Sequence, residues 1–332
     1  MLGRFPPAAE TAFAWLESQT PGVPAFEGGP PCPAATEAAI ETAISYGADD
    51  LAARWRAWML DNRSDDRTDD AIDQARARQC RDVSISDWPD GPRVSTDGMA
   101  RQALVWLRRG DLARGGRALD FVAARRPRGW AAIWYLQAAR LQVAASFAAS
   151  GMPPLTDIDP RDGRWLAVEE MFSTLPPDAH VADVGCGAGR YMLRLRSQFP
   201  EMRLVGIDPA AAALASLPEE IPARVGDLLR LPAADGEFDA AVCVEALEHS
   251  LLPRRAVAEL CRAVRTGGRL LIIDKDSARQ PLARHEPWER WFTAEEVRGW
   301  LAEHCRETTS RHIPHGVPAR DSRLFIAWMG KK

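Results

Sequence analysis

The chain has 332 residues, of which 46% are hydrophobic and 27% charged, and this is enough for two globular domains with separate cores. Its formal net charge of -4 gives no strongly basic surface, so we expect no nucleic-acid partner.

The cysteines and the most apolar segment indicate the cellular compartment and whether the chain crosses a membrane. The six cysteines form no CxxC pair and lie mostly in apolar runs, which favours reduced thiols over a disulfide framework or a zinc site. Residues 1–20 lack the apolar core of a signal peptide. The most apolar helical stretch, 130–149, carries Gln137 and Arg140 near its middle, and these would be costly to bury in lipid. We therefore expect a cytoplasmic protein without a membrane span.

The first half of the chain is predicted to be all-helical. Apolar residues recur there at steps of three and four, and strand patterns are nearly absent before residue 180. The expected helices cover residues 35–46, 49–62, 97–109, 111–125 and 130–150. These segments predict an all-α domain over residues 1–150, and the proline-rich stretch 151–159 is the predicted linker.

The second half, residues 151–332, changes pattern. After a helix predicted at 161–175, short apolar runs alternate with helical segments. The expected strands are 181–184, 203–207, 223–225, 240–244 and 269–273. Such alternation predicts the α/β class, with a doubly wound, mostly parallel sheet. A final apolar run, 323–329, is followed by no helix, and we expect it to be an edge strand.

A glycine-rich turn is the strongest local signal. The first expected strand leads into Gly185-Cys-Gly187-Ala-Gly189 and then into a helix that contains Tyr191. Glycines let a ligand approach the main chain closely, and such turns lie where open parallel sheets bind nucleotides. A dinucleotide fold would have GxGxxG, whose third glycine falls here on Arg190, and this disfavours a nicotinamide oxidoreductase.

The GxGxG spacing, preceded by Asp183, resembles motif I of the class I S-adenosylmethionine-dependent methyltransferases. Further segments match that family in order: Asp208-Pro209 after the second strand, Gly226-Asp227-Leu228, the segment 242–249, and the glycine turn 266–273. The resemblance covers roughly residues 162–330. It implies a Rossmann-like fold, S-adenosylmethionine as cofactor, and methyl transfer.

The resemblance also implies roles for individual residues. The glycine loop would hold the methionine portion of the cofactor, with Asp183 near its amino group. Asp208 would accept the ribose hydroxyls and Asp227 would contact the adenine amino group; a lone acid after a strand can instead cap the next helix. The implied cofactor-binding set is Asp183, Gly185, Gly187, Gly189, Tyr191, Asp208, Pro209, Asp227, Leu228 and Glu245.

His249, just past the fourth strand, is the candidate general base for an oxygen acceptor. The alternative is that it caps a short helix. Some relatives use the Glu245-x-x-Glu248-His249 pattern to hold a divalent metal, but many with the same segment bind none, and we expect no metal. Trp288 and Trp291 either stack on an acceptor or anchor their loop.

The N-terminal half, mainly through the stretch 43–62, resembles the helical toroid modules joined to methyltransferases in some bacterial polysaccharide-associated proteins. The hypothesis is therefore a methyltransferase that acts on oxygen or nitrogen of a small-molecule or glycan-related acceptor, with the helical half as a cap over the acceptor site. The alternative is a non-catalytic binding or scaffolding protein with a degenerate methyltransferase fold, against which the intact Asp183, Asp208 and Asp227 argue. Nothing in the sequence specifies an oligomeric state.

Overall fold

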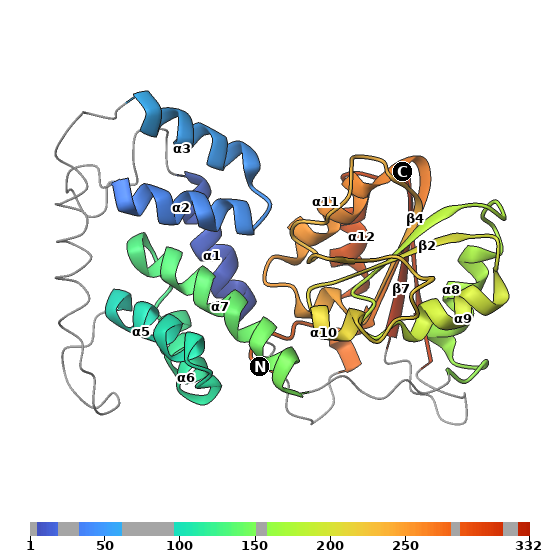
Figure 1. The fold of residues 1–332 in the computed structure, drawn as a ribbon, viewed down its shortest axis with the longest axis horizontal. Coiled ribbons are helices and arrows are strands. Elements are labelled where there is room, and N and C mark those ends of the chain that lie inside the picture. Colours follow the sequence, from blue (N-terminus) through green and yellow to red (C-terminus); the bar gives the residue numbers. More distant parts are fainter. Residues whose placement is uncertain (1–4, 19–32, 62–95, 151–157, 280–285, 315–324) are drawn as a thin grey trace. The chain divides into compact units, whose positions relative to one another are not determined.

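The computed structural model describes residues 5–18, 33–61, 96–150, 158–279, 286–314 and 325–332 (Figure 1). The chain divides into two compact units. One, the helical unit, ends at Ala145, and the other, the sheet unit, begins at Ser146. The division falls inside a long helix, and most of the predicted linker, residues 151–157, lies outside the described residues.

All described elements of the helical unit are helices, as predicted. They are α1 (Phe5–Ser18), α2 (Pro33–Ser45), α3 (Asp49–Asp61), α5 (Thr96–Arg108), α6 (Leu112–Ala123) and α7 (Gly129–Ser150). Aromatic side chains fill the core of this unit. Trp55 is buried there, and the hydroxyl of the buried Tyr46 donates a hydrogen bond to the carbonyl of Leu136 at 2.7 Å. Within the described ranges, no helix combines the length and the apolarity that a membrane crossing requires.

The sheet unit has a seven-stranded sheet with the order β3-β2-β1-β4-β5-β7-β6 (Figure 1). The strands are β1 (His180–Val184), β2 (Arg203–Asp208), β3 (Ala223–Val225), β4 (Phe238–Val244), β5 (Val264–Lys275), β6 (Glu307–Ile313) and β7 (Phe325–Lys331). The first five pair in parallel, and β7 is antiparallel to both β5 and β6. This confirms the predicted α/β class with a mostly parallel sheet.

Helices connect the strands and cover the sheet. They are α8 (Gly163–Phe172), α9 (Arg190–Gln198), α10 (Ala211–Leu214), α11 (Pro253–Ala263) and α12 (Ala294–Ala302), with short 3-10 turns η1 (Leu247–His249) and η2 (Ser277–Arg279). The central strands β1 and β4 are mostly apolar and largely buried, because helices cover such a sheet on both faces. Their carboxyl ends, where polar residues begin, meet at one edge of the sheet.

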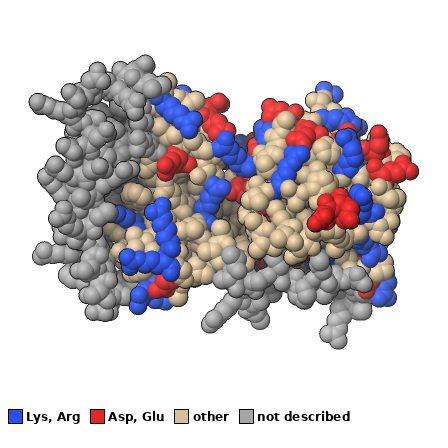
Figure 2. Space-filling view, viewed as in Figure 1, with Lys and Arg blue, Asp and Glu red and all other residues tan. Residues whose placement is uncertain are grey.

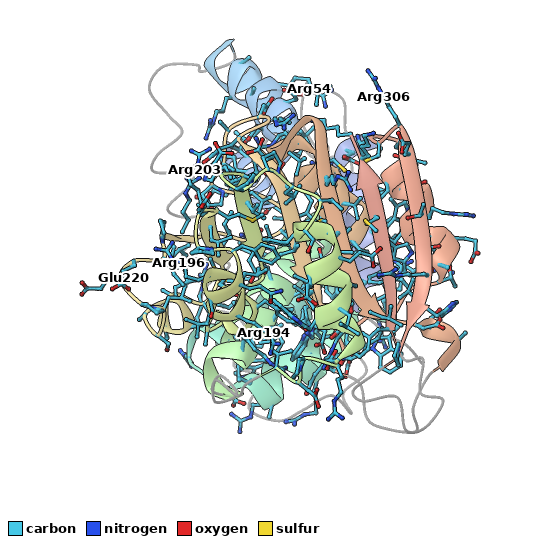
Figure 3. All side chains as sticks on the ribbon, turned by 90° about the vertical axis from the view of Figure 1, so that its right-hand side faces the viewer. Arg54, Arg194, Arg196, Arg203, Glu220 and Arg306 are labelled. Atoms are coloured by element: carbon cyan, nitrogen blue, oxygen red, sulfur yellow. The ribbon has the colours of Figure 1, made fainter. Side chains whose placement is uncertain are left out.

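The expectation that the last strand lies at the edge is wrong. β7 lies between β5 and β6, and β6 forms the edge; the two C-terminal strands, in the red end of the colour scale, are seen at the right of the sheet in Figure 3. The reason is compositional. β7 is mostly buried and hydrophobic, whereas most residues of β6, including Glu307 and Arg311, are polar and largely exposed. A solvent-facing edge strand carries no apolar run that would reveal it.

The interior position of β7 predicts a large cost for truncating Trp328. This side chain is fully buried, and its Nε1 donates to the carbonyl of Ala294 at 2.9 Å, which ties β7 to α12. We expect Trp328→Ala to lower the free energy of unfolding by about 3 to 5 kcal/mol, measured by urea denaturation. Truncation of the exposed Leu166 to alanine should change it by no more than about 0.5 kcal/mol. Equal effects of the two variants would contradict the assignment of β7 to the interior.

Candidate active site

The order of the strands changes direction beside β1, which marks the end of this strand as a candidate ligand site. The chain runs outward from β1 to β2 and β3 and then returns to β4 on the other side of β1. Open α/β sheets bind ligands at such a switch point, outside the carboxyl ends of the strands. The predicted site residues follow β1, β2, β3 and β4 at this edge.

The glycine loop after β1 has a conformation that other residues adopt only with strain. Gly185 and Gly189 have φ angles of 77° and 83°. A Cβ on Gly185 would lie 2.3 Å from the Cβ of Ala246, and one on Gly189 would lie 2.0 Å from a methyl of Leu217. Both positions therefore require glycine, which leaves bare main chain at the edge of the sheet.

Asp208 ties the end of β2 to this loop. One carboxylate oxygen accepts the Gly187 N–H at 2.8 Å, and the other accepts the Ala210 N–H at 2.8 Å. The residue that caps α10 is Ala210, so the helix-capping interpretation of Asp208 is wrong. A carboxylate has about four acceptor positions, so this buried group still has capacity for the hydroxyls of a ligand. Burial raises its pKa.

Asp183, the last acid before the loop, is only 4% exposed. Its Oδ2 finds no hydrogen-bond partner among the described residues. Burial, together with the nearby charge of Asp208, raises the pKa of Asp183 to about 7. A buried acid without a partner is costly. The position fits a group that pairs with a cationic part of a ligand.

The other predicted residues on this side follow the neighbouring strands. Asp227 comes after β3, and its carboxylate accepts the Leu229 N–H at 2.9 Å. Leu228 beside it is partly buried, and Pro209 is exposed. Asp227 after β3, Asp208 after β2 and the glycine loop after β1 therefore follow three neighbouring strands in this order.

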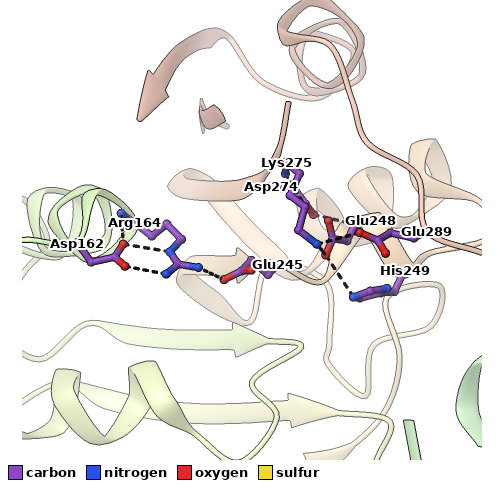
Figure 4. Close-up of polar contacts among 8 residues, drawn as sticks. All are labelled: Asp162, Arg164, Glu245, Glu248, His249, Asp274, Lys275 and Glu289. Carbon is purple, nitrogen blue, oxygen red and sulfur yellow. Dashed lines mark hydrogen bonds and ion pairs between the residues drawn. The ribbon is translucent and has the colours of Figure 1, made fainter. Parts of the chain in front are cut away.

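On the other side of β1, Glu245 follows β4 with a positive φ of 52°, which is rare for a residue with a side chain. Its carboxylate forms an ion pair with Arg164 of α8 (Figure 4). Arg164 is itself buried. It forms a bidentate ion pair with Asp162, with Nε–Oδ1 and NH2–Oδ2 distances of 3.0 and 2.7 Å. Tyr191, also at this place, has a buried hydroxyl that has no hydrogen-bond partner within the described part of the chain.

Arg164 and Asp162 belong to no motif, and sequence reasoning did not single them out. The only local signal is that Asp162 begins α8 as its N-cap and accepts the Arg164 N–H at 2.8 Å. The contact that brings Arg164 to the site joins it to a residue 81 positions further along the chain.

A second group of charges lies past β4 and β5 (Figure 4). Lys275 places its Nζ 2.7 Å from Glu248 Oε1 and 2.8 Å from Glu289 Oε1. Burial raises the pKa of Glu248, and it raises that of Asp274 to about 6. Burial disfavours the charged form of Lys275 as well, but its two carboxylate partners hold its pKa above the usual value. This group fixes η1 and the loop after β5 against each other.

His249 lies within η1 and touches this second group. Its Nε2 is 3.3 Å from Glu248 Oε1, and its ring packs edge-on against Phe147, with 4.8 Å between the ring centroids. Burial lowers its pKa to about 4, so the imidazole is neutral at pH 7. Its Nδ1 has no hydrogen-bond partner among the described residues. The cap of η1 is Ala246, so His249 does not cap that turn.

The two carboxylates of the Glu245-x-x-Glu248-His249 pattern point to different cations. Glu245 pairs with Arg164, while Glu248 pairs with Lys275. The described residues contain no group of three or more His, Cys, Asp or Glu side chains that could hold a metal. The expectation of no metal stays a prediction.

The two tryptophans after β5 are both buried. The Nε1–H of Trp291 donates a hydrogen bond to Glu289 at 2.7 Å. The ring centroid of Trp291 lies 5.4 Å from the Nζ of Lys275. It therefore anchors the loop, as in the second of the two interpretations. Trp288 has no partner for its Nε1 among the described residues.

Comparison with known proteins matches part of the sheet unit to a known family. A family model described as "Methyltransferase domain" matches residues 182–272. An O-methyltransferase of Penicillium expansum is 32% identical over 104 residues, which are 29% of this chain and 37% of the relative. A demethylmenaquinone methyltransferase of Roseiflexus sp. is 29% identical over 132 residues, covering 38% and 56%. A tRNA (carboxymethyluridine(34)-5-O)-methyltransferase of Macaca fascicularis is 32% identical over 112 residues, covering 32% and 16%.

The chain thus spans between 16% and 56% of the length of these three relatives. A solved structure titled as a possible histamine N-methyltransferase from Thermotoga maritima has a TM-score of 0.41 and 19% identity, over 51% of this chain and 89% of that one. The glycine loop, the row of acids and the matched family model together identify the sheet unit as a class I S-adenosylmethionine-dependent methyltransferase domain.

Proposed function

We propose that this protein transfers a methyl group from S-adenosylmethionine to an oxygen or nitrogen atom of a small-molecule or glycan-related acceptor. The observation that carries the proposal is the partly buried, neutral His249, which lies beyond β4 and whose Nδ1 has no hydrogen-bond partner among the described residues. The relatives named above act on different acceptors, so they support methyl transfer more than any one substrate.

The cofactor residues fit the parts of S-adenosylmethionine in the order of the strands. Asp227 after β3 suits the adenine amino group, and Asp208 after β2 has free capacity for the ribose hydroxyls. The bare main chain of the glycine loop suits the methionine portion, and Asp183 suits its ammonium group. When bound, the cofactor supplies an electrophilic methyl group on a sulfonium.

The protein's own contribution is to orient the acceptor and to take its proton. With Nε2–H directed at Glu248, the lone pair of His249 is on Nδ1, which can accept a proton from an acceptor hydroxyl as the new bond to carbon forms. A base with a lowered pKa is weak but is always in the unprotonated form at neutral pH. The charge of Glu289 favours the imidazolium that results, while burial and the charge of Lys275 oppose it.

The surface favours a small acceptor over nucleic acid. In the face seen in Figure 2, acidic and basic side chains are interspersed over the sheet unit, and the net charge of the chain is -4. A nucleic-acid site would need a basic patch. Phe147, in the last turns of α7, contacts His249 within the sheet unit. We also propose that the helical unit acts as a cap over the acceptor site, a role that would help to exclude water.

The first prediction from this proposal concerns Asp183. Its folded-state pKa of about 7 lies above the usual 3.8, so between these values the folded chain holds a proton that the unfolded chain has lost. Stability therefore falls as pH rises through this window. We expect Asp183→Asn to raise the urea midpoint, more at pH 8 than at pH 5. We also expect it to weaken S-adenosylhomocysteine binding at pH 8 by on the order of tenfold or more, measured by calorimetry.

This combination separates a ligand-binding role from a structural one. If Asp183 had a structural role, its replacement would lower the urea midpoint of the protein at both pH values. A gain in stability without any loss of affinity would show that Asp183 is strained but does not face the cofactor.

The second prediction concerns His249 and the acceptor. With tritiated S-adenosylmethionine and a panel of phenols, quinols, amines and sugars, we expect the full chain to label at least one small molecule and to leave purified tRNA unlabelled. His249→Asn should lower kcat about 10² to 10⁴-fold with an oxygen acceptor, with the cofactor Kd unchanged. The exposed His304→Asn is the matched control and should have no effect. Cofactor binding without transfer to any acceptor would instead favour the non-catalytic binding protein, and labelled tRNA would contradict the small-molecule proposal.

A further inference from the structure

Two thiols from distant parts of the sheet unit lie beside each other, outside the site described above. The Sγ atoms of Cys261, on α11, and of Cys305, just past α12, are 4.0 Å apart, although 44 positions separate the two residues along the chain. Both are free thiols in the structure. Cys261 is buried, whereas Cys305 is partly exposed, and the other cysteines within the described ranges are buried. Solvent therefore reaches the pair through Cys305.

The main chain on both sides of the pair is held by hydrogen bonds. The N–H of Cys305 donates to the carbonyl of Leu301 at 2.8 Å, and the next N–H, of Arg306, donates to the carbonyl of Lys331 at 2.9 Å. Cys261 lies inside α11. A disulfide has an S–S distance of about 2.0 Å, so the two sulfurs must approach each other by about 2 Å. Movement of the two side chains can supply this approach while the main chain stays in place.

Gly330 of β7 leaves room for the sulfur of Cys305. A Cβ on Gly330 would lie 2.8 Å from this Sγ, closer than a real Cβ comes to another heavy atom. A glycine inside a strand often marks such a close approach. The strand thus lacks a side chain at the position where the thiol of Cys305 lies against it.

The two thiols differ in their acidity. The hydrogen bond with Cys261 and the charge of Lys332 lower the pKa of Cys305, whereas the hydrogen bond with Cys305 and burial raise the pKa of Cys261. The Nζ of Lys332 is itself held by the carbonyl of Val264 at 2.8 Å. The thiolate is the reactive form of cysteine, and redox-sensitive cysteines are accessible, acidic and placed beside a second cysteine. Cys305 has these properties, and Cys261 is its second cysteine.

We propose that Cys261 and Cys305 form a redox modification site, at which hydrogen peroxide converts the two thiols reversibly into a disulfide. The Cys305 sulfur attacks one peroxide oxygen, the O–O bond breaks, and Cys305 becomes a sulfenic acid while the other oxygen leaves as water. The Cys261 sulfur then attacks the Cys305 sulfur, the S–O bond breaks, and the departing oxygen takes the Cys261 proton and leaves as a second water. The two sulfurs together give two electrons to the peroxide, and a dithiol reductant reverses the change.

The disulfide would join α11 to the segment that leads into β6, the polar edge strand. It would close a chain segment of 44 residues, which restricts the unfolded chain and so stabilises the folded one. This inference does not depend on the identity of the methyl acceptor or of the cofactor.

The test is treatment of the purified full chain with hydrogen peroxide, followed by proteolysis without reductant and mass spectrometry. We expect two peptides joined through Cys261 and Cys305, lighter by two hydrogen atoms than the two reduced peptides together. The urea midpoint of the oxidised chain should lie about 1 M or more above that of the reduced chain. Dithiothreitol should remove both the cross-link and the shift.

Single substitutions supply the controls. Cys305→Ser should abolish the cross-link and the shift of the urea midpoint. In Cys261→Ser, Cys305 has no second thiol to react with, so we expect peroxide to carry it on to the sulfinic acid. Because Cys305 is partly exposed, Cys305→Ser keeps the test available even if Cys261→Ser does not fold. Cys32→Ser removes a thiol elsewhere in the chain and should change neither result.

Two outcomes would overturn the inference. One is a Cys305 of the wild-type chain that stays a free thiol, or becomes a sulfinic acid without a cross-link, under peroxide. The other is a peroxide-induced shift of the urea midpoint that persists in Cys305→Ser.

Discussion

The hydrogen bond from the Gly187 N–H to Asp208 holds the glycine loop in the conformation on which the site depends. It joins the turn after β1 to the end of β2, while the other carboxylate oxygen fixes the start of the next segment at Ala210. The loop itself can adopt this shape only because Gly185 and Gly189 lack side chains. One acid therefore has two tasks, to shape the loop and to present its remaining lone pairs at the edge of the sheet.

Two groups of buried charged side chains lie around this loop, and they differ in how completely their charges are paired. The group of Lys275, Glu248 and Glu289 is paired internally and holds η1 against the loop after β5. Around the proposed cofactor site, the Oδ2 of Asp183 has no hydrogen-bond partner among the described residues. Native proteins rarely leave buried polar groups unsatisfied, and the exceptions gather where a ligand completes them. This difference supports the proposal that the ligand binds on the side of Asp183.

Much of the sheet unit could be predicted from the sequence, because the parallel strands β1, β2 and β4 are largely buried and appear as short apolar runs. The strand 223–225 has the predicted bounds, and the glycine loop and its acids lie together as the family pattern implies. Two features could not be predicted. The edge strand β6 is polar and exposed, so it has no apolar signal. Arg164 reaches the site only through the tertiary contact with Glu245, and periodicity along the chain does not report such contacts.

The central claim is that the carboxyl end of β1 binds S-adenosylmethionine and not a dinucleotide, although both ligands use a strand, a glycine turn and an acid after the next strand. Calorimetric titration of the full chain with S-adenosylhomocysteine and, separately, with NAD tests it most directly. The account predicts saturable binding of S-adenosylhomocysteine with a Kd in the micromolar range, about -8 kcal/mol, and no heat from NAD at millimolar concentration. Binding of NAD, displaced by neither S-adenosylmethionine nor its product, would contradict it.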